Sequence, residues 1–101
     1  MSNHFLLSLI LFTAYLIGSV PFGVIVATLY GVDLRQKGSG NTGATNVLRT
    51  LGPLPAAIVF TGDLFKGTLA VAMASYLTNI PLIIVAAGIA AMLGHIFSIF
   101  L

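Results

Sequence analysis

The sequence predicts an all-α fold, a polytopic integral membrane helical bundle with about three transmembrane helices. Of its 101 residues, 58% are hydrophobic and only 6% are charged, whereas roughly 25% of the residues in soluble domains are charged. The charges are also segregated, because residues 2–32 and 67–101 contain no Asp, Glu, Lys or Arg. Apolar stretches of about 20 residues can cross a bilayer as helices. This composition excludes an ordinary soluble domain.

The apolar stretches divide into three expected spans and one polar loop. Pro21 should kink the first span, and Thr78-Asn79-Ile80-Pro81 is a turn signal between the second and the third. We expect one membrane domain over residues 1–101, truncated at its C-terminus, because residues 94–101 form an apolar run without a polar tail. The expected spans are residues 5–30, 55–77 and 81–101, and the expected loop is residues 32–52.

The charged residues of the loop predict the orientation in the membrane. Arg35, Lys37 and Arg49 outnumber Asp33 there, whereas residues 1–4 and 77–81 hold no Lys or Arg. The positive-inside rule therefore places loop 32–52 in the cytoplasm and the N-terminus outside. Because the net charge of +2 arises mostly from this loop, it indicates topology, and we expect membrane lipids and no nucleic acid among the partners.

Small residues recur at helical spacing in the second and third spans. Ala86, Ala90 and Gly94 lie four residues apart, as do Ala70 and Ala74. Such rows allow membrane helices to approach closely, so we expect these faces to pack within the bundle.

The loop contains a glycine-rich polar segment that is typical of an oxyanion-binding surface. Consecutive backbone N–H groups bind phosphate well where glycine leaves them accessible, and arginine offers a planar fork for bidentate phosphate recognition. The alternative is a flexible connector whose basic residues only fix the topology. The candidate phosphate-binding residues here are Gly38, Ser39, Gly40, Asn41, Gly43, Thr45, Asn46 and Arg49.

The same segment matches a dinucleotide fingerprint formally, because Gly38, Gly40 and Gly43 have the Gly-x-Gly-x-x-Gly spacing. That fingerprint needs a preceding buried strand and a soluble βαβ unit. Here polar residues 33–37 precede the segment and a membrane span follows it. We therefore expect no nucleotide cofactor. The chain contains no cysteine, which excludes disulfides and thiolate metal sites, and we expect neither a metal nor any other cofactor.

Three ionisable residues lie inside the expected spans. Asp63 and Lys66 are three residues apart and share a helix face, and each charge costs about 2.5–3.5 kcal/mol at the centre of a membrane helix. We expect Lys66 to face an anionic substrate and Asp63 to orient its polar neighbours; the alternative is a mutually neutralising pair. His95 is expected near the level of the glycine-rich loop, as a catalyst or as a satisfied interface residue.

These patterns resemble the bacterial integral-membrane glycerol-3-phosphate acyltransferases that use acyl-phosphate, the PlsY family. The resemblance covers essentially the whole chain, and its most specific part is the loop segment. The matching segments are Gly18-Ser19-Val20-Pro21-Phe22-Gly23, the segment from Gly38 to Arg49, Gly62-Asp63-x-x-Lys66-Gly67 and Gly94-His95-x-Phe97.

The resemblance implies acyl transfer from acyl-phosphate to the 1-hydroxyl of glycerol-3-phosphate, which gives 1-acyl-glycerol-3-phosphate for phospholipid biosynthesis. It implies Ser39, Arg49 and His95 as catalytic residues, a bacterial inner-membrane location and a functional link to the soluble enzyme that makes acyl-phosphate. Members of the family continue after the Gly94-His95 stretch with a lysine- and glycine-rich loop and a further motif. We therefore expect this chain to be an N-terminal portion that is incomplete and inactive alone.

Two other functions remain open from the sequence. A small transporter subunit for an anion or a lipid precursor also uses broken helices with polar residues at the midplane. Such a subunit needs polar residues that open to both sides of the membrane, whereas those predicted here lie on one side. A membrane fragment without catalytic activity is the other alternative.

Overall fold

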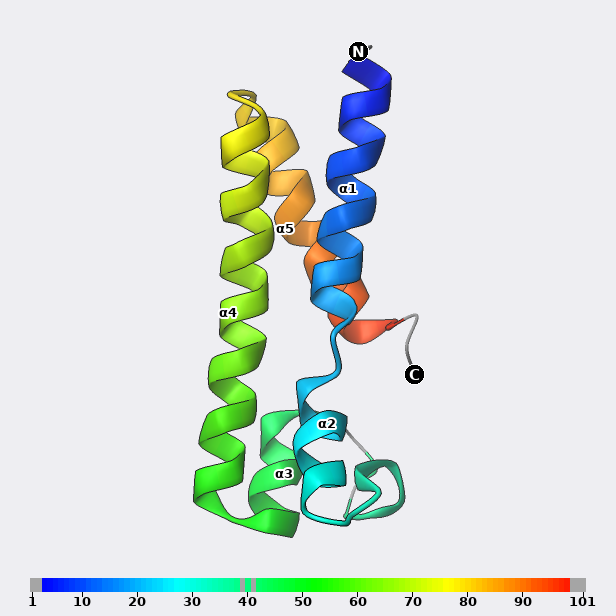
Figure 1. The fold of residues 1–101 in the computed structure, drawn as a ribbon, viewed down its shortest axis with the longest axis vertical. Helices are drawn as coiled ribbons and strands as arrows, with labels where there is room; N and C mark the ends of the chain where they lie inside the picture. The colour runs from blue at the N-terminus through cyan, green and yellow to red at the C-terminus, as the bar shows by residue number, and fades with distance from the viewer. Residues whose placement is uncertain (1–2, 39, 41, 99–101) are drawn as a thin grey trace. The chain divides into compact units, whose positions relative to one another are not determined.

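The computed structural model describes residues 3–38, 40 and 42–98. Within these residues all regular secondary structure is helical (Figure 1), as the sequence predicts. The elements are α1 (Asn3–Ser19), α2 (Phe22–Leu29), the 3₁₀-helix η1 (Leu34–Gln36), α3 (Ala44–Leu51), α4 (Pro53–Leu77) and α5 (Pro81–Ile96).

Two helical stretches are long and apolar enough to cross a membrane, His4–Leu29 with 26 residues and Pro53–Leu77 with 25. The third expected span is represented by α5, an apolar helix of 16 residues that ends at Ile96. The expected span over 81–101 is therefore too long for the helix itself. Its last residues, 99–101, lie outside the described part of the chain.

The first expected span breaks instead of kinking. Helix α1 ends at Ser19 and α2 begins at Phe22, with Val20 and Pro21 outside both helices. Proline lacks the N–H that would continue the helical ladder, and its ring clashes with the carbonyl of residue i−4. Proline also disfavours helical backbone at the preceding residue. These two effects end α1 and start a new helix, which corrects the expectation of one kinked helix over residues 5–30.

The chain forms two compact units. The first comprises Met1–Val20 and Phe65–Leu101, and the second comprises Pro21–Leu64. Each unit has a hydrophobic core of its own. The expectation of one membrane domain over residues 1–101 stays a prediction.

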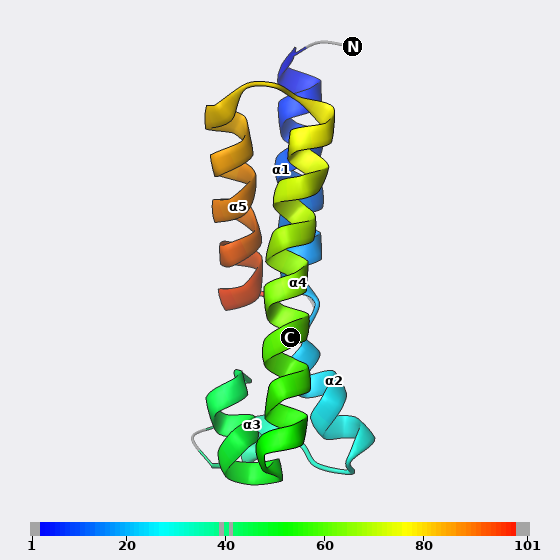
Figure 2. The ribbon, with the colours of Figure 1, turned by 90° about the vertical axis from the view of Figure 1, so that its left-hand side faces the viewer.

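The first unit packs α1, α5 and the C-terminal part of α4 around small residues. Figure 2 shows α4 and α5 running alongside each other after the turn at residues 78–80. Helix α1 approaches α5 so closely that a Cβ atom on Gly18 would overlap the carbonyl oxygen of Ala91. The buried core residues are Ile10, Ala14, Ala70, Ala74, Ala87 and Ala91.

The burial of Ala70, Ala74 and Gly94 agrees with the sequence prediction, whereas the other buried residues of α5, Ala87 and Ala91, lie one position after the predicted Ala86 and Ala90. The fully buried side of α5 consists of Ala87, Ala91 and Gly94, whereas Ala86 and Ala90 are only half-buried. Adjacent rows of small residues have the same four-residue spacing, so the spacing alone cannot tell which row faces the neighbouring helix.

The second unit packs α2, η1, α3 and the first part of α4 around six buried apolar residues. The expected loop over residues 32–52 therefore contains η1 and the helix α3. Extended backbone at Gly43 precedes α3, and Gly52 ends it with a φ of 99°. Burial of Val47 on one side of α3 stabilises this short polar helix, which composition alone does not reveal. The core residues are Val26, Ala27, Leu34, Val47, Ala56 and Val59.

Candidate functional site

The glycine-rich segment opens with a tight turn whose conformation requires glycine. Gly38 and Gly40 have φ values of 55° and 77°, in the left-handed region that side chains with a Cβ rarely adopt. The Gly40 N–H donates to the carbonyl oxygen of Lys37 at 2.9 Å and closes the turn. The backbone then becomes extended at Gly43 and enters α3. The two catalytic and phosphate-binding candidates Ser39 and Asn41 lie outside the described residues.

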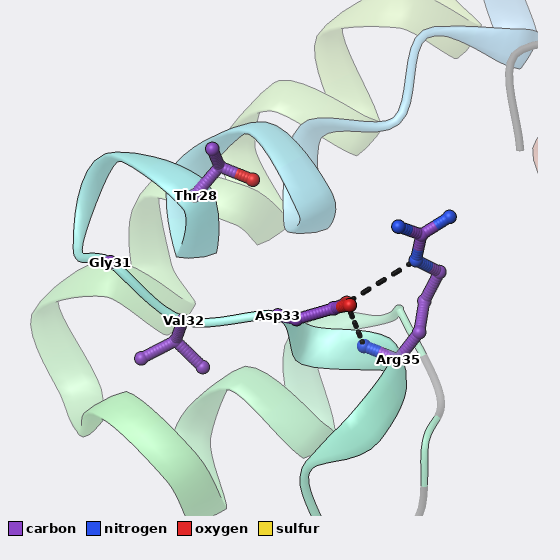
Figure 3. Close-up of a pocket in the computed structure, with 5 residues that line it drawn as sticks. All are labelled: Thr28, Gly31, Val32, Asp33 and Arg35. Carbon is purple, nitrogen blue, oxygen red and sulfur yellow. Dashed lines mark hydrogen bonds and ion pairs between the residues drawn. The ribbon is translucent and has the colours of Figure 1, made fainter.

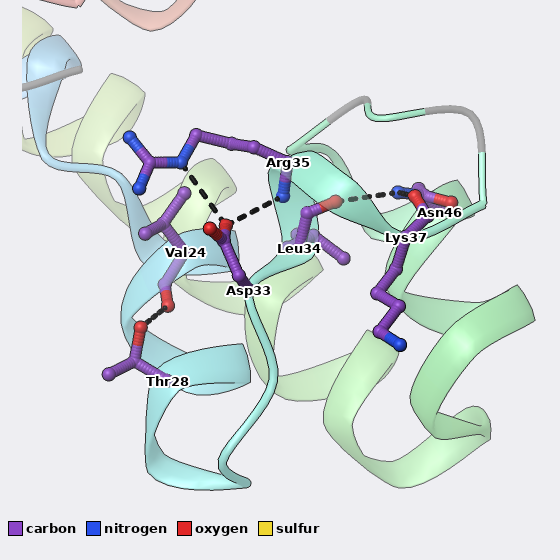
Figure 4. Close-up of polar contacts among 7 residues, drawn as sticks. All are labelled: Val24, Thr28, Asp33, Leu34, Arg35, Lys37 and Asn46. Carbon is purple, nitrogen blue, oxygen red and sulfur yellow. Dashed lines mark hydrogen bonds and ion pairs between the residues drawn. The ribbon is translucent and has the colours of Figure 1, made fainter.

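Asn46 is buried beneath this turn, with 1% of its surface exposed. Its Nδ2 atom donates to the carbonyl oxygens of Lys37, at 2.9 Å, and Leu34, at 3.5 Å (Figure 4). The amide nitrogen of Asn46 is thus used by the protein backbone. The predicted role of Asn46 as a phosphate-binding donor stays a prediction, and the structure adds a backbone-holding role that the sequence did not indicate.

Helix α3 presents a different face to the outside. Thr45 and Arg49 are exposed, and their four-residue spacing puts them on the same side of the helix. Asn46 and Val47 are buried. Within the part of the chain that the structure describes, the Arg49 guanidinium makes no hydrogen bond or ion pair. An arginine with this exposure can take a phosphate in bidentate fashion.

A shallow pocket of about 330 Å³ lies at the start of η1 (Figure 3). Asp33 Oδ1 accepts hydrogen bonds from the backbone N–H of Arg35, at 3.1 Å, and from its Nε, at 3.3 Å. The Thr28 hydroxyl donates to the Val24 carbonyl at 2.7 Å (Figure 4). From the sequence, Asp33 and Arg35 are expected only to set the topology, although an Asp at the start of a helical turn is a cap signal. The pocket is lined by Thr28, Gly31, Val32, Asp33 and Arg35.

Lys66 is buried within the first unit, with 5% of its surface exposed. Its Nζ atom donates to the carbonyl oxygen of Val20 at 2.9 Å, just past the end of α1. A cation is favourable beside the C-terminal end of a helix, where unpaired carbonyls carry partial negative charge. The structure thus gives Lys66 a contact with the protein backbone, and its predicted role of facing a substrate stays a prediction.

His95 is exposed in the last turn of α5, next to a close contact between α5 and α1. A Cβ atom on Gly94 would overlap the Tyr15 carbonyl oxygen. The Tyr15 hydroxyl donates to the Phe97 carbonyl, and the Ser98 hydroxyl donates to the Ser19 carbonyl. These bonds tie the two helix ends together. They form between residues about eighty positions apart, so no local sequence pattern reveals them.

The two compact units divide the predicted site residues. Gly38, Gly40, Gly43, Thr45, Asn46, Arg49 and the half-buried Asp63 belong to the second unit, whereas Lys66 and His95 belong to the first. Among residues 3–38, 40 and 42–98, no three His, Cys, Asp or Glu side chains are grouped so that they could hold a metal ion.

Comparison with known proteins finds similarity along nearly the whole chain. The sequence profile described as glycerol-3-phosphate acyltransferase matches residues 8–101. A glycerol-3-phosphate acyltransferase of Bacillus subtilis is 49% identical over 96 residues, which cover 94% of this chain and 49% of that protein. One of Thermus thermophilus is 53% identical over 91 residues, with 90% and 46% covered. The chain thus spans about half the length of the curated relatives it matches.

A solved structure is also similar. It is a crystal structure of PlsY, described as an integral membrane glycerol 3-phosphate acyltransferase in its glycerol 3-phosphate form. The identity is 41% and the TM-score 0.84, over 93% of this chain and 48% of that one. Together with the apolar helices, this similarity confirms the predicted fold class, an all-α integral membrane bundle.

Proposed function

Because this chain belongs to the glycerol-3-phosphate acyltransferase family, we propose that it contributes one wall of the active site of such an enzyme. The glycine-rich segment and the exposed face of α3 would bind a substrate phosphate. The reaction would be acyl transfer from acyl-phosphate to the 1-hydroxyl of glycerol-3-phosphate. The transporter alternative gains no support from the similar proteins named above, which are acyltransferases.

The observation that carries this proposal is the exposure of Arg49 on the same face of α3 as Thr45, directly after the glycine turn. A guanidinium without a partner in the described part of the chain is ready to take two phosphate oxygens. The exposed backbone of Gly38 would add an N–H donor, whereas the Gly40 N–H is engaged by the Lys37 carbonyl oxygen. Ser39 and Asn41 are proposed to complete the phosphate contacts and Asp63 to support them, whereas the substrate-facing role of Lys66 stays a prediction.

The proposed chemistry balances without a cofactor. The 1-hydroxyl oxygen of glycerol-3-phosphate attacks the carbonyl carbon of acyl-phosphate, the bond from that carbon to the phosphate oxygen breaks, and inorganic phosphate leaves with the electron pair. The hydroxyl proton goes to the departing phosphate. Arg49 and Ser39 would stabilise the charge that develops on this phosphate, which is how preorganised donors lower barriers. His95 would help position the second substrate.

The proposed cellular setting follows from the topology and the donor. The loop at 32–52 would face the cytoplasm and the N-terminus the outside of a bacterial inner membrane. Acyl-phosphate would then arrive from the soluble enzyme that makes it, and the product would remain in the membrane lipids.

A chimera tests the proposal, since the chain spans about half of its relatives. In the chimera this chain replaces the matching part of the Bacillus subtilis protein. We expect the chimera to acylate glycerol-3-phosphate with acyl-phosphate, and not with the acyl-coenzyme A thioester. A chimera that inserts into membranes and transfers from neither donor would refute the proposed function. Activity with the thioester alone would refute the proposed donor.

Two arginine variants of the chimera test the phosphate-binding face. Arg49→Ala should lower kcat/KM by about 100-fold or more, because a charge-stabilising donor is lost. Arg35→Ala is the matched control, since Arg35 is exposed but engages Asp33, and we expect it to stay within about threefold of the unmodified chimera. Near-normal activity of Arg49→Ala would remove Arg49 from the site.

A further inference from the structure

We infer that Asn46 is a positioning residue that holds the glycine turn in its binding shape, while its buried amide nitrogen stays on the protein backbone. This inference rests on the proposed function only in assuming that the turn binds phosphate. The contacts that carry it all lie within the second compact unit.

Asn46 forms hydrogen bonds to two backbone carbonyls of the second unit. Its Nδ2 atom carries two N–H groups, which reach the carbonyl oxygens of Leu34 and Lys37. Each of these carbonyls also accepts one backbone N–H, from Lys37 at 3.2 Å and from Gly40 at 2.9 Å respectively. Asn46 therefore fastens α3 to η1 and to the turn that follows it.

Asn46 also lies in close contact with Gly38. A Cβ atom placed on Gly38 would overlap Oδ1 of Asn46. Gly40 also has a positive φ, but the nearest atom to a Cβ placed there is the Arg35 carbonyl oxygen, at 3.1 Å. The two glycines thus share the backbone requirement and differ in whether Asn46 lies against them.

The side chain of Asn46 is buried. With 1% of its surface exposed, the Asn46 side chain is covered by the elements it connects. A group that binds substrate directly must be reachable, as the neighbouring Thr45 and Arg49 are. Asn46 therefore acts through the turn, and its effect on the substrate is indirect.

Amide exchange in the full 101-residue chain, held in lipid nanodiscs, tests the inference without any substrate. Asn46→Asp keeps the size of the side chain but replaces the donor with a carboxylate that faces two carbonyl oxygens. We expect the Gly40 amide to exchange at least about tenfold faster in this variant, because the turn opens locally. Thr45→Val, on the exposed side of the same helix, is the control and should leave the rate unchanged. An unchanged rate in Asn46→Asp would overturn the inference.

A double-mutant cycle keeps the test decisive if Asn46→Asp does not fold. Gly38→Ala should accelerate Gly40 amide exchange strongly in the unmodified chain. In the Asn46→Ala background the acceleration caused by Gly38→Ala should be at least about fivefold smaller, since the overlap with the Asn46 side chain is then gone. Gly40 cannot report on its own replacement, so the matched cycle of Gly40→Ala with Asn46→Ala is read at the Lys37 amide and should be additive. Additive effects in the Gly38 cycle would contradict the inference.

Kinetics of the chimera then separate positioning from direct binding. Asn46→Asp should raise the KM for acyl-phosphate by at least about tenfold and change kcat less than about threefold, because the turn binds the phosphate of this substrate poorly while the reacting groups remain. A rise in KM and a fall in kcat of equal size, with normal amide exchange at Gly40, would show that Asn46 binds the substrate directly. An inactive chimera with Asn46 intact refutes the proposed function, whereas the exchange rates still decide the role of Asn46.

Discussion

The Nζ atom of Lys66 donates a hydrogen bond to the carbonyl oxygen of Val20, 46 residues earlier in the chain, at 2.9 Å. Pro21 follows Val20 and has no N–H to continue the helical ladder, so α1 ends with carbonyls that lack helical donors. A buried ammonium supplies one missing donor and opposes the negative end of the helix. The break between α1 and α2 therefore explains why the apolar helix α4 carries the charged side chain of Lys66.

Lys66→Met should lower the free energy of unfolding by about 1–3 kcal/mol, because the Val20 carbonyl loses its donor in a buried place. Lys37→Met is the matched control: its side chain is exposed, and we expect a change below about 0.5 kcal/mol. Unfolding in mixed micelles without phosphate or glycerol-3-phosphate measures both. Equal stability of Lys66→Met and the unmodified chain would leave only a ligand-binding role for Lys66.

The contact between Gly94 and Tyr15 sets how closely α5 approaches α1. Gly94→Ala should destabilise the first unit by about 1–3 kcal/mol, because the new methyl group meets backbone atoms that cannot rotate away. Gly67→Ala is the control on another apolar helix, since nothing lies within 4 Å of a Cβ placed there. Thermal unfolding in detergent compares the two. A larger loss from Gly67→Ala than from Gly94→Ala would contradict the packing described for α1 and α5.

The length of the apolar stretches predicts the long helices of this fold well, because a membrane span depends on the number of consecutive apolar residues rather than on which apolar residues they are. Helix α4 begins at Pro53 and ends at Leu77, within two residues of the prediction. The sequence pattern does not predict helix α3, because this helix is short and polar. Its stability comes from burying Val47 against residues from other parts of the chain, and single-sequence periodicity does not contain that information.

The candidate site shows the same division. The glycines and Arg49 are predicted as phosphate-binding residues because their residue types alone indicate an anion site, and that role stays a prediction. The backbone partners of Asn46 and Lys66 could not be predicted, since each hydrogen bond depends on a carbonyl brought close by tertiary folding. A polar residue type shows what a side chain can bind, and the fold decides whether that partner is a ligand or the protein itself.

Gly23 connects helix α2 to the glycine-rich segment. A Cβ atom on Gly23 would overlap the carbonyl oxygen of Thr42, and Gly23 itself is buried. Gly23→Ala should therefore displace the backbone before Gly43 and reduce kcat/KM of the chimera by at least about tenfold, since misplacement of about 1 Å is costly at an active site. Val24→Ala, one residue further along α2 and half-buried, serves as the control for general damage to the helix. Comparable activity of the two variants would disconnect Gly23 from the site.

The predicted orientation of the chain can be tested by single cysteines, because the sequence contains none of its own. Gln36 is exposed in η1, within the predicted cytoplasmic segment, and Asn79 is exposed in the turn between α4 and α5. We expect a membrane-impermeant maleimide to label Asn79→Cys in spheroplasts and Gln36→Cys only after permeabilisation, because the positively charged segment stays in the cytoplasm. The pair controls for reactivity, since both positions should react once the membrane is opened. Labelling of Gln36→Cys in intact spheroplasts would show the inverse topology. The phosphate-binding face would then lie on the outer side of the membrane, away from acyl-phosphate made in the cytoplasm.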